Sequence, residues 1–182
     1  MSNDNPLARP SWRRLRRWLV QGAILLLALY LVHLWQTRDS VRGPAPALSA
    51  QLLSGAPFSL ETPRDKPLLI YFWATWCPVC KLTSSNIDAL TDRHQVVTVA
   101  MHSGDAAAIG AYLREKGLHF PVIADPQGRI SKAWRVKGVP TVYLVDTHGD
   151  IRSVSVGYIS TLGIKARLWL SGSNTPSSWQ GE

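Results

Sequence analysis

The sequence predicts an α/β domain, a three-layer sandwich with a mixed central sheet and flanking helices, preceded by one N-terminal transmembrane helix. After residue 67, short apolar segments rich in β-branched and aromatic residues alternate with helical patterns, which indicates parallel strands joined by helices. The segments 141–145 and 151–156 flank a turn, which is typical of a β-hairpin and makes the sheet mixed. Near the N-terminus, an apolar run follows a cluster of arginines.

Residues 1–17 form a basic segment, and residues 18–35 form an apolar run whose polar members, Gln21 and His33, lie near its ends. A helix of that length spans most of a hydrocarbon layer of about 30 Å. Because arginines precede the run and few charges follow it, we expect a cytoplasmic N-terminus, a single-pass anchor and a domain outside the cytoplasm. A cleaved signal peptide is the alternative, but Ala45-Pro46-Ala47 lies far beyond the run and contains a proline.

The net charge of the chain is +8, from 20 Lys and Arg against 12 Asp and Glu. Five arginines and one aspartate precede residue 36, so 15 basic and 11 acidic residues remain for the rest of the chain. This excess is mild and scattered, and we therefore expect no nucleic-acid partner.

Residues 36–48 are predicted as a Pro/Ala linker, because Gly43-Pro44-Ala45-Pro46-Ala47 favours a stiff, extended chain. The folded domain is expected over residues 49–170. A polar tail at 171–182, rich in Ser and Gly, is predicted to be disordered.

Turn and capping residues divide the domain into elements. Asp105 can cap a helix that runs to about Lys116, with Gly117 as its stop. In chain order, the sequence predicts a strand pair over 50–60, strands at 68–73 and 95–101, the helix after Asp105, a strand at 120–124, a short helix at 127–134, the hairpin, and a last helix at 161–170.

Both cysteines follow the apolar segment Leu68–Trp73, where a predicted strand gives way to a helix. Pro78 suits the first turn of that helix, since its missing N–H would have no partner there. Free N–H groups and the helix dipole favour an anion at Cys77, and such a site brings a thiol pKa from about 8.5 to roughly 3.5–7.5. Cys80 lies one turn on, so the pair suits thiol–disulfide exchange in which Cys77 attacks and Cys80 resolves.

A zinc site and a purely structural disulfide are alternatives for the same pair. Structural zinc takes four ligands, and the sequence has no second C-x-x-C and no H-x-x-x-H. A disulfide that closes so short a loop stabilises little through chain entropy. A redox role is therefore the interpretation that the spacing favours.

Two motifs resemble known proteins. Trp73-Ala74-Thr75-Trp76-Cys77-Pro78-Val79-Cys80 resembles the active site of the thioredoxin superfamily, and it looks most like the membrane-anchored bacterial TlpA/ResA/CcmG group and the ScsD-type protein disulfide oxidoreductases. Gly138-Val139-Pro140-Thr141-Val142-Tyr143-Leu144-Val145-Asp146 is similar to the cis-proline loop and following strand of the same superfamily. The resemblance covers roughly residues 48–170.

The resemblance implies a protein thiol–disulfide oxidoreductase with a thioredoxin-like fold, placed in the bacterial inner membrane with its catalytic domain in the periplasm. Its expected partners are client proteins with cysteine pairs and a membrane thiol–disulfide electron carrier. No cofactor beyond the redox-active disulfide and no metal are implied. The catalytic residues would be Cys77, Cys80 and Pro140, and the substrate-binding residues Val139, Trp76, Pro78 and Val79.

The sequence departs from the superfamily pattern at one position beneath the cysteines. Thioredoxins proper place an acid six residues before the first cysteine to move a proton to or from the buried thiol, and Tyr71 stands there. His102, which follows the strand at 95–101, is a possible proton relay in its place. An ordinary solvated loop histidine is the alternative reading of His102.

Two other functions are alternatives to thiol–disulfide exchange. A copper-binding or copper-tolerance protein of the Sco type would have C-x-x-x-C, whereas the spacing here is C-x-x-C. A thiol peroxidase of this fold would have P-x-x-x-T-x-x-C, whereas Ile70 and Ala74 occupy the Pro and Thr positions. The direction of electron flow stays open, as do cytochrome c biogenesis, copper tolerance and general oxidative folding as the setting.

Overall fold

The computed structural model describes residues 12–38, 43–160 and 162–164, and the chain divides into two compact units, Met1–Arg38 and Asp39–Glu182. The first unit contains the helix α1 (Trp12–Arg38). Within the residues that the structure describes, no helix is both long enough and apolar enough to cross a membrane. The anchor at 18–35 and its orientation stay predictions.

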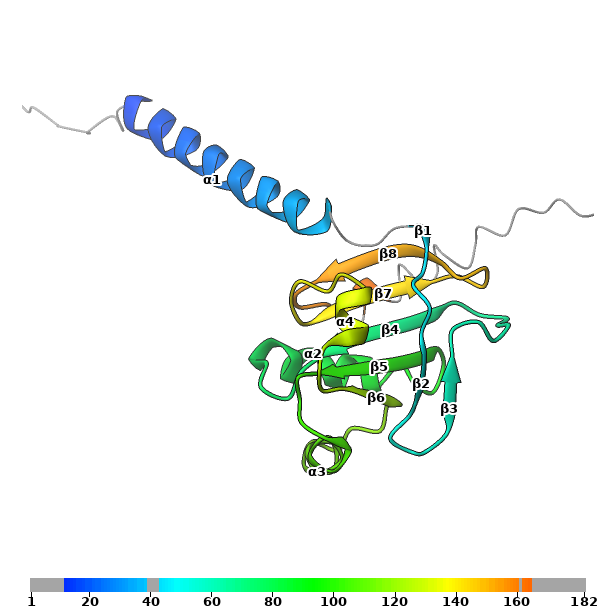
Figure 1. Cartoon of the computed structure of the whole chain (residues 1–182). Helices are drawn as coiled ribbons and strands as arrows, with labels where there is room; N and C mark the ends of the chain where they lie inside the picture. The colour runs from blue at the N-terminus through cyan, green and yellow to red at the C-terminus, as the bar shows by residue number, and fades with distance from the viewer. Residues whose placement is uncertain (1–11, 39–42, 161, 165–182) are drawn as a thin grey trace, which may run out of the picture. The chain divides into compact units, whose positions relative to one another are not determined.

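The second unit is built on a six-stranded sheet in the order β1-β8-β7-β4-β5-β6 (Figure 1). Strands β4, β5 and β6 run parallel, whereas β7 is antiparallel to β4 and β8 is antiparallel to β7. The sheet is therefore mixed, as predicted. Its strands are β1 (Gly43–Pro44), β4 (Leu68–Trp73), β5 (Gln95–Met101), β6 (Val122–Asp125), β7 (Thr141–Val145) and β8 (Asp150–Val156), and a separate antiparallel pair consists of β2 (Ser49–Gln51) and β3 (Pro57–Ser59).

Helices cover both faces of the sheet: α2 (Pro78–Asp88) and α3 (Ala106–Lys116) on one side, α4 (Arg129–Ala133) on the other. Alternate residues of β4 point to opposite faces. Tyr71 and Trp73 belong to the core cluster that includes residues of α2 and α3, whereas Ile70 and Phe72 pack in a second cluster with Trp134. All six residues of β4 are buried, as expected of a central strand covered on both faces. The predicted α/β sandwich is confirmed.

The structure corrects the end of the predicted linker. Gly43 and Pro44 pair with β8 at the edge of the sheet, and the Ala45 N–H donates to the Gly149 carbonyl at 2.9 Å. Leu48 is buried in the core. An edge strand tolerates the missing N–H of Pro44, so the extended segment that the prolines favour is used as a strand instead of a spacer.

Most element ends lie where the sequence predicts them. The Asp105 carboxylate accepts the Ala108 N–H at 2.8 Å, and Gly117 ends α3 in the left-handed conformation (φ 62°). Strand β6 begins two residues later than expected. Helix α4 begins after Gly128, which has a φ of 67°, a left-handed conformation that glycine adopts more readily than any other residue type. Residues 162–164 of the last predicted helix are helical, while 165–170 and the tail 171–182 lie outside the described residues.

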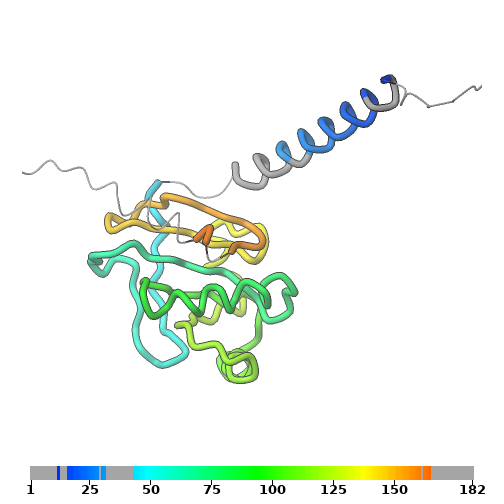
Figure 2. The backbone as a smooth tube through the Cα atoms, turned by 180° about the vertical axis from the view of Figure 1, so that it is seen from behind, coloured from blue at the N-terminus to red at the C-terminus, as the bar shows by residue number. Residues whose placement is uncertain are grey.

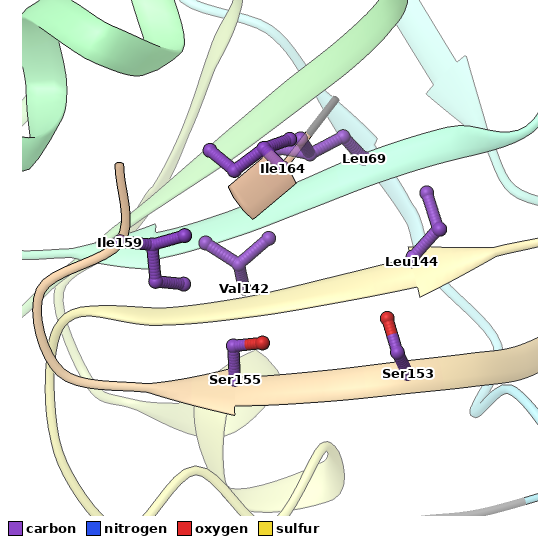
Figure 3. A pocket seen from close by; sticks show the side chains of 7 residues that line it. All are labelled: Leu69, Val142, Leu144, Ser153, Ser155, Ile159 and Ile164. Atoms are coloured by element: carbon purple, nitrogen blue, oxygen red, sulfur yellow. The ribbon is translucent and has the colours of Figure 1, made fainter. Parts of the chain in front are cut away.

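The segment after β8 lies on the face of the sheet that α2 covers. Ile159 and Ile164 are buried, and they line a small apolar pocket with Leu69, Val142 and Leu144 (Figure 3). Burial of these two isoleucines fixes the segment beside α2.

Asp146 organises the turn between β7 and β8. Its carboxylate is almost fully buried and accepts the N–H groups of His148 and Asp150 at 2.8 and 2.9 Å, and Arg152 Nε at 2.7 Å. Burial alone would raise the pKa of Asp146, but the N–H groups of Asp150 and His148 and the Arg152 guanidinium together hold it below its ordinary value.

We expect Asp146→Asn to lower the free energy of unfolding by about 1–3 kcal/mol at pH 7, because a buried charged acceptor is lost. A depressed native pKa stabilises the fold above the unfolded-state pKa of roughly 3.9, and this contribution is lost as the pH falls through the native value. Denaturant unfolding at pH 7 and pH 3 measures both effects. A difference between variant and wild type that stays constant across this range would contradict the assignment.

Candidate active site

Cys77 lies at the junction of β4 and α2, as predicted. It is the N-cap of α2, with extended backbone (φ −86°, ψ 114°), and Pro78 occupies the first turn. Its Sγ accepts the backbone N–H of Cys80 at 3.1 Å, so a helix N-terminal N–H points at the sulfur. This geometry favours negative charge on Sγ when the thiol is free.

Cys77 and Cys80 form a disulfide, with Cα atoms 5.2 Å apart. Cys77 retains 4 % of its surface exposed, whereas Cys80 has none. The two sulfurs are therefore unequal: one sits at the helix end near the surface, and the other is enclosed one turn inside. This inequality suits an attacking and a resolving role.

The structure brings the loop Gly138–Thr141 to Cys77. The Val139–Pro140 peptide bond is cis, as the resemblance implies, and the Val139 carbonyl oxygen lies 3.5 Å from Cys77 Sγ. Thr141 Oγ1 donates to the Gly138 carbonyl at 2.6 Å, and the Gly157 N–H donates to the Pro140 carbonyl at 2.8 Å. These bonds hold the loop against the end of β8.

The residues expected to border a substrate are exposed beside the cysteines. Trp76 is 59 % exposed and Val79 40 %, and Pro78 is also exposed. Trp76 Nε1 donates to the His102 carbonyl at 3.0 Å, which ties its indole to the loop after β5.

His102 lies in the loop after β5, and its ring contacts the loop before α4. Its Nδ1 lies 3.1 Å from the Pro126 carbonyl oxygen, and its ring lies against Gly128, where a Cβ would approach Nε2 to 2.7 Å. A left-handed backbone (φ 47°) turns the side chain toward the loop before α4. The relay role of His102 stays a prediction, and the contact that the structure gives it with the active-site turn is its carbonyl, which accepts the Trp76 indole N–H.

Sequence reasoning missed a serine that supports the active-site loop. Ser103 Oγ accepts the Thr75 N–H at 3.0 Å and donates to the Met101 carbonyl at 2.9 Å. This bridge fixes the turn that carries the chain from β4 into Cys77. A serine after a strand carries no distinguishing signal in one sequence.

Tyr71 lies beneath Cys80. Its hydroxyl is buried and lies 3.4 Å from the Cys80 carbonyl oxygen and 3.3 Å from Ser84 Oγ, distances that correspond to weak hydrogen bonds. Burial raises the pKa of Tyr71 far above its ordinary value, so the phenol stays neutral throughout the physiological range. A neutral phenol thus replaces the carboxylate of thioredoxins proper.

The described residues contain no group of three or more His, Cys, Asp or Glu side chains placed to hold a metal ion. The geometry of the site concerns the chemistry of the two cysteine sulfurs.

A thioredoxin-like fold that presents this cysteine pair beside a cis-proline loop defines a thiol–disulfide oxidoreductase. More particularly, the chain belongs to the AhpC/TSA family, whose model matches residues 41–154. It is 34 % identical over 165 residues to a thioredoxin-like protein of Haemophilus influenzae, covering 87 % of this chain and 97 % of that protein.

Two further comparisons indicate the same class of protein. The thiol-disulfide oxidoreductase ResA of Geobacillus thermodenitrificans is 26 % identical over 168 residues, covering 86 % of this chain and 97 % of that protein. A crystal structure of a thiol:disulfide interchange protein from Chlorobium tepidum has the same fold, with a TM-score of 0.62 and 24 % identity, covering 73 % of this chain and 98 % of that one. Relatives named as oxidoreductases support an oxidoreductase role here.

We expect the rate at which the reduced protein reacts with a small disulfide to show only the step of the Cys77 thiol itself, and no second, carboxylate-like step between about pH 4 and 7, because Tyr71 does not titrate there. Tyr71→Asp should add such a step, whereas Tyr71→Phe should not. Stopped-flow rates across this range test it, with circular dichroism as the check of folding. A second step in the wild type, in addition to that of the Cys77 thiol, would show that another acid serves Cys80.

Proposed function

We propose that the chain is a membrane-anchored periplasmic thiol–disulfide oxidoreductase that exchanges disulfides with protein cysteine pairs. The observation that carries this proposal is the position of Cys77 Sγ, which contacts both a helix N-terminal N–H and the Val139 carbonyl at an exposed edge of the domain. The first contact prepares a nucleophile, and the second places it beside a peptide-docking backbone.

The reaction follows from the inequality of the two sulfurs. In the reduced protein, the Cys77 thiolate attacks a client disulfide, forms a mixed disulfide, and releases one client sulfur as a thiolate that takes up a proton. The Cys80 thiol loses its proton and attacks Cys77 Sγ, which releases the second client sulfur. The client is reduced and the pair is oxidised. The reverse sequence oxidises a client dithiol.

The loop at Val139 and Pro140 gives the client a place to bind. An extended client segment can pair with the backbone of Val139 by strand addition, which sets its cysteine beside Cys77. Trp76, Pro78 and Val79 border that segment. A membrane thiol–disulfide electron carrier would use the same edge to restore the pair after each turnover.

The two cysteine variants test the proposal. Cys80→Ser should accumulate covalent complexes with client proteins, because the mixed disulfide at Cys77 cannot be resolved internally. Cys77→Ser should form few, since the buried Cys80 is enclosed by the fold. Non-reducing electrophoresis of cells treated with acid and an alkylating agent measures the complexes. Mass spectrometry then identifies the clients and distinguishes cytochrome c biogenesis, copper tolerance and general folding.

Equal trapping by both variants, or equal alkylation rates of the two thiols in the reduced wild type, would contradict these roles. Cells that carry Cys77→Ser/Cys80→Ser supply the background. The in-cell redox state of the wild-type pair gives the direction of electron flow: mainly reduced for a reductase, mainly oxidised for an oxidant.

The anchor is the second part of the proposal. It is supported by the arginines before the apolar run and by the large, exposed apolar side chains of α1, among them Trp18, Leu19, Leu25 and Leu26. Tryptophan and tyrosine near the ends of the run suit the membrane interface.

We expect the full-length chain to remain with membranes after a carbonate wash and to be digested by protease added to spheroplasts. A variant in which a cleavable signal peptide replaces residues 1–35 should yield the domain in soluble form. A wild-type protein that fractionates as soluble, with an N-terminus near residue 48, would contradict the anchor.

A further inference from the structure

One stretch of the domain carries its whole excess of basic charge. Between the buried residues Asp125 and Asp146, the chain has four cationic side chains and no acid. After residue 35 the chain has 15 basic and 11 acidic residues, so the positions outside this stretch carry 11 of each and balance. The excess is therefore concentrated at one place, whereas the composition alone predicts a scattered one. We call the four cationic residues the α4 basic surface: Arg129, Lys132, Arg135 and Lys137.

The α4 basic surface faces solvent, since all four of its residues are exposed. Within the described residues, no ion pair neutralises Arg129, Lys132 or Arg135. The two acids that bound the stretch are buried, and their carboxylates accept hydrogen bonds inside the domain. The charge of these three cations is therefore not compensated by the protein itself.

Helix α4 gives the cations a rigid support. The Asp125 carboxylate accepts the backbone N–H and the hydroxyl of Ser131 at 2.9 and 2.7 Å. Trp134 is fully buried, and its carbonyl accepts the Tyr143 hydroxyl at 2.6 Å. The helix lies on the face of the sheet opposite α2: α4 is in front of the sheet in Figure 1, and α2 is in front in the reverse view of Figure 2. The basic side chains are thus displayed from a fixed backbone.

Both ends of the segment that carries the α4 basic surface contact the redox site. At its start, the ring of His102 lies against Gly128, and the His102 carbonyl accepts the Trp76 indole N–H at 3.0 Å. At its end, two residues beyond the last cation, the Val139 carbonyl oxygen lies 3.5 Å from Cys77 Sγ. A protein that reaches Cys77 with its own cysteine therefore lies beside this surface on the α4 side.

An uncompensated positive surface attracts acidic molecules and raises the rate at which they meet it. The attraction extends over about one Debye length, roughly 10 Å at 0.1 M salt. Anionic lipid headgroups carry the same sign of charge as an acidic protein. The position beside Cys77 favours a protein that exchanges disulfides, because anything bound there lies next to the reactive sulfur.

We propose that the α4 basic surface is a docking surface for client proteins that carry acidic residues beside the cysteine that Cys77 attacks. The proposal rests on the proposed function and adds to it a substrate class, namely clients with acidic residues around a disulfide. The two cysteines perform the exchange, and the cations set which clients arrive fastest.

Two synthetic peptides of equal length test this, each with one internal disulfide and with either glutamates or glutamines beside the cysteines. The full-length reduced protein in an uncharged detergent reduces each peptide, and acid-quenched mass spectrometry gives the rate constants. Each rate constant is divided by that of the same peptide with dithiothreitol, which corrects for intrinsic reactivity. We expect the corrected ratio of the wild type to favour the glutamate peptide by about three- to tenfold at low ionic strength. The ratio should approach one in about 1 M salt, where the Debye length is about 3 Å.

The double variant Lys132→Gln/Arg135→Gln should lower the low-salt ratio toward one. The ratio is the readout because a change in the Cys77 thiolate would slow both peptides alike. Lys66→Gln/Arg93→Gln is the matched control: it also removes two exposed cations, but these precede β4 and β5, at the ends of the strands opposite Cys77. It should keep the wild-type ratio.

A wild-type ratio near one at low ionic strength overturns the docking proposal, and so does a ratio that Lys132→Gln/Arg135→Gln leaves unchanged. A surface that binds lipid headgroups would give either result. An equal fall of the ratio in the control also overturns it, because net charge would then be the cause. In these cases both peptides are still reduced, so the proposed function stands. Failure to reduce either peptide overturns the proposed function itself and this proposal with it.

Discussion

The contact between Cys77 Sγ and the Cys80 N–H is the interaction on which the rest of the site depends. It exists because a buried strand, β4, ends just before a helix begins, and because Cys77 is the N-cap of that helix. β4 is held in place because it has a hydrogen-bonded strand on each side and a hydrophobic core on each face. The α/β sandwich is therefore the frame that fixes one sulfur atom at a helix N-terminus.

Two supports keep that sulfur in place, and each comes from a different strand. On one side, Ser103 after β5 bonds the Thr75 N–H, and the His102 carbonyl accepts the Trp76 indole. On the other, the end of β8 bonds the Pro140 carbonyl through Gly157. The active-site turn and the cis-proline loop are thus positioned by β5 and β8, two strands of one sheet, so their relative geometry follows from strand order.

The sequence was sufficient wherever local chemistry decides the structure. The strand ending before Cys77, the cap at Asp105 and the stop at Gly117 all rest on patterns of a few residues, and the structure confirms them. It was not sufficient where a distant partner decides. Pro44 is predicted as part of a spacer, but it pairs with β8. Nothing in the sequence indicates the left-handed backbone of His102, which turns its ring toward Pro126.

The balance between thiol and thiolate at Cys77 depends on two opposed contacts. A thiolate at Sγ accepts the Cys80 N–H, and a hydrogen bond to a charged acceptor contributes about 1.5–3 kcal/mol. The Val139 carbonyl at 3.5 Å instead repels a thiolate and can accept a weak S–H bond from the neutral thiol. The stronger contact favours the thiolate, while the weaker one opposes it only as long as the carbonyl faces the sulfur. A client strand that hydrogen-bonds to Val139 draws on that same carbonyl, so binding of a client would itself shift Cys77 toward its reactive form.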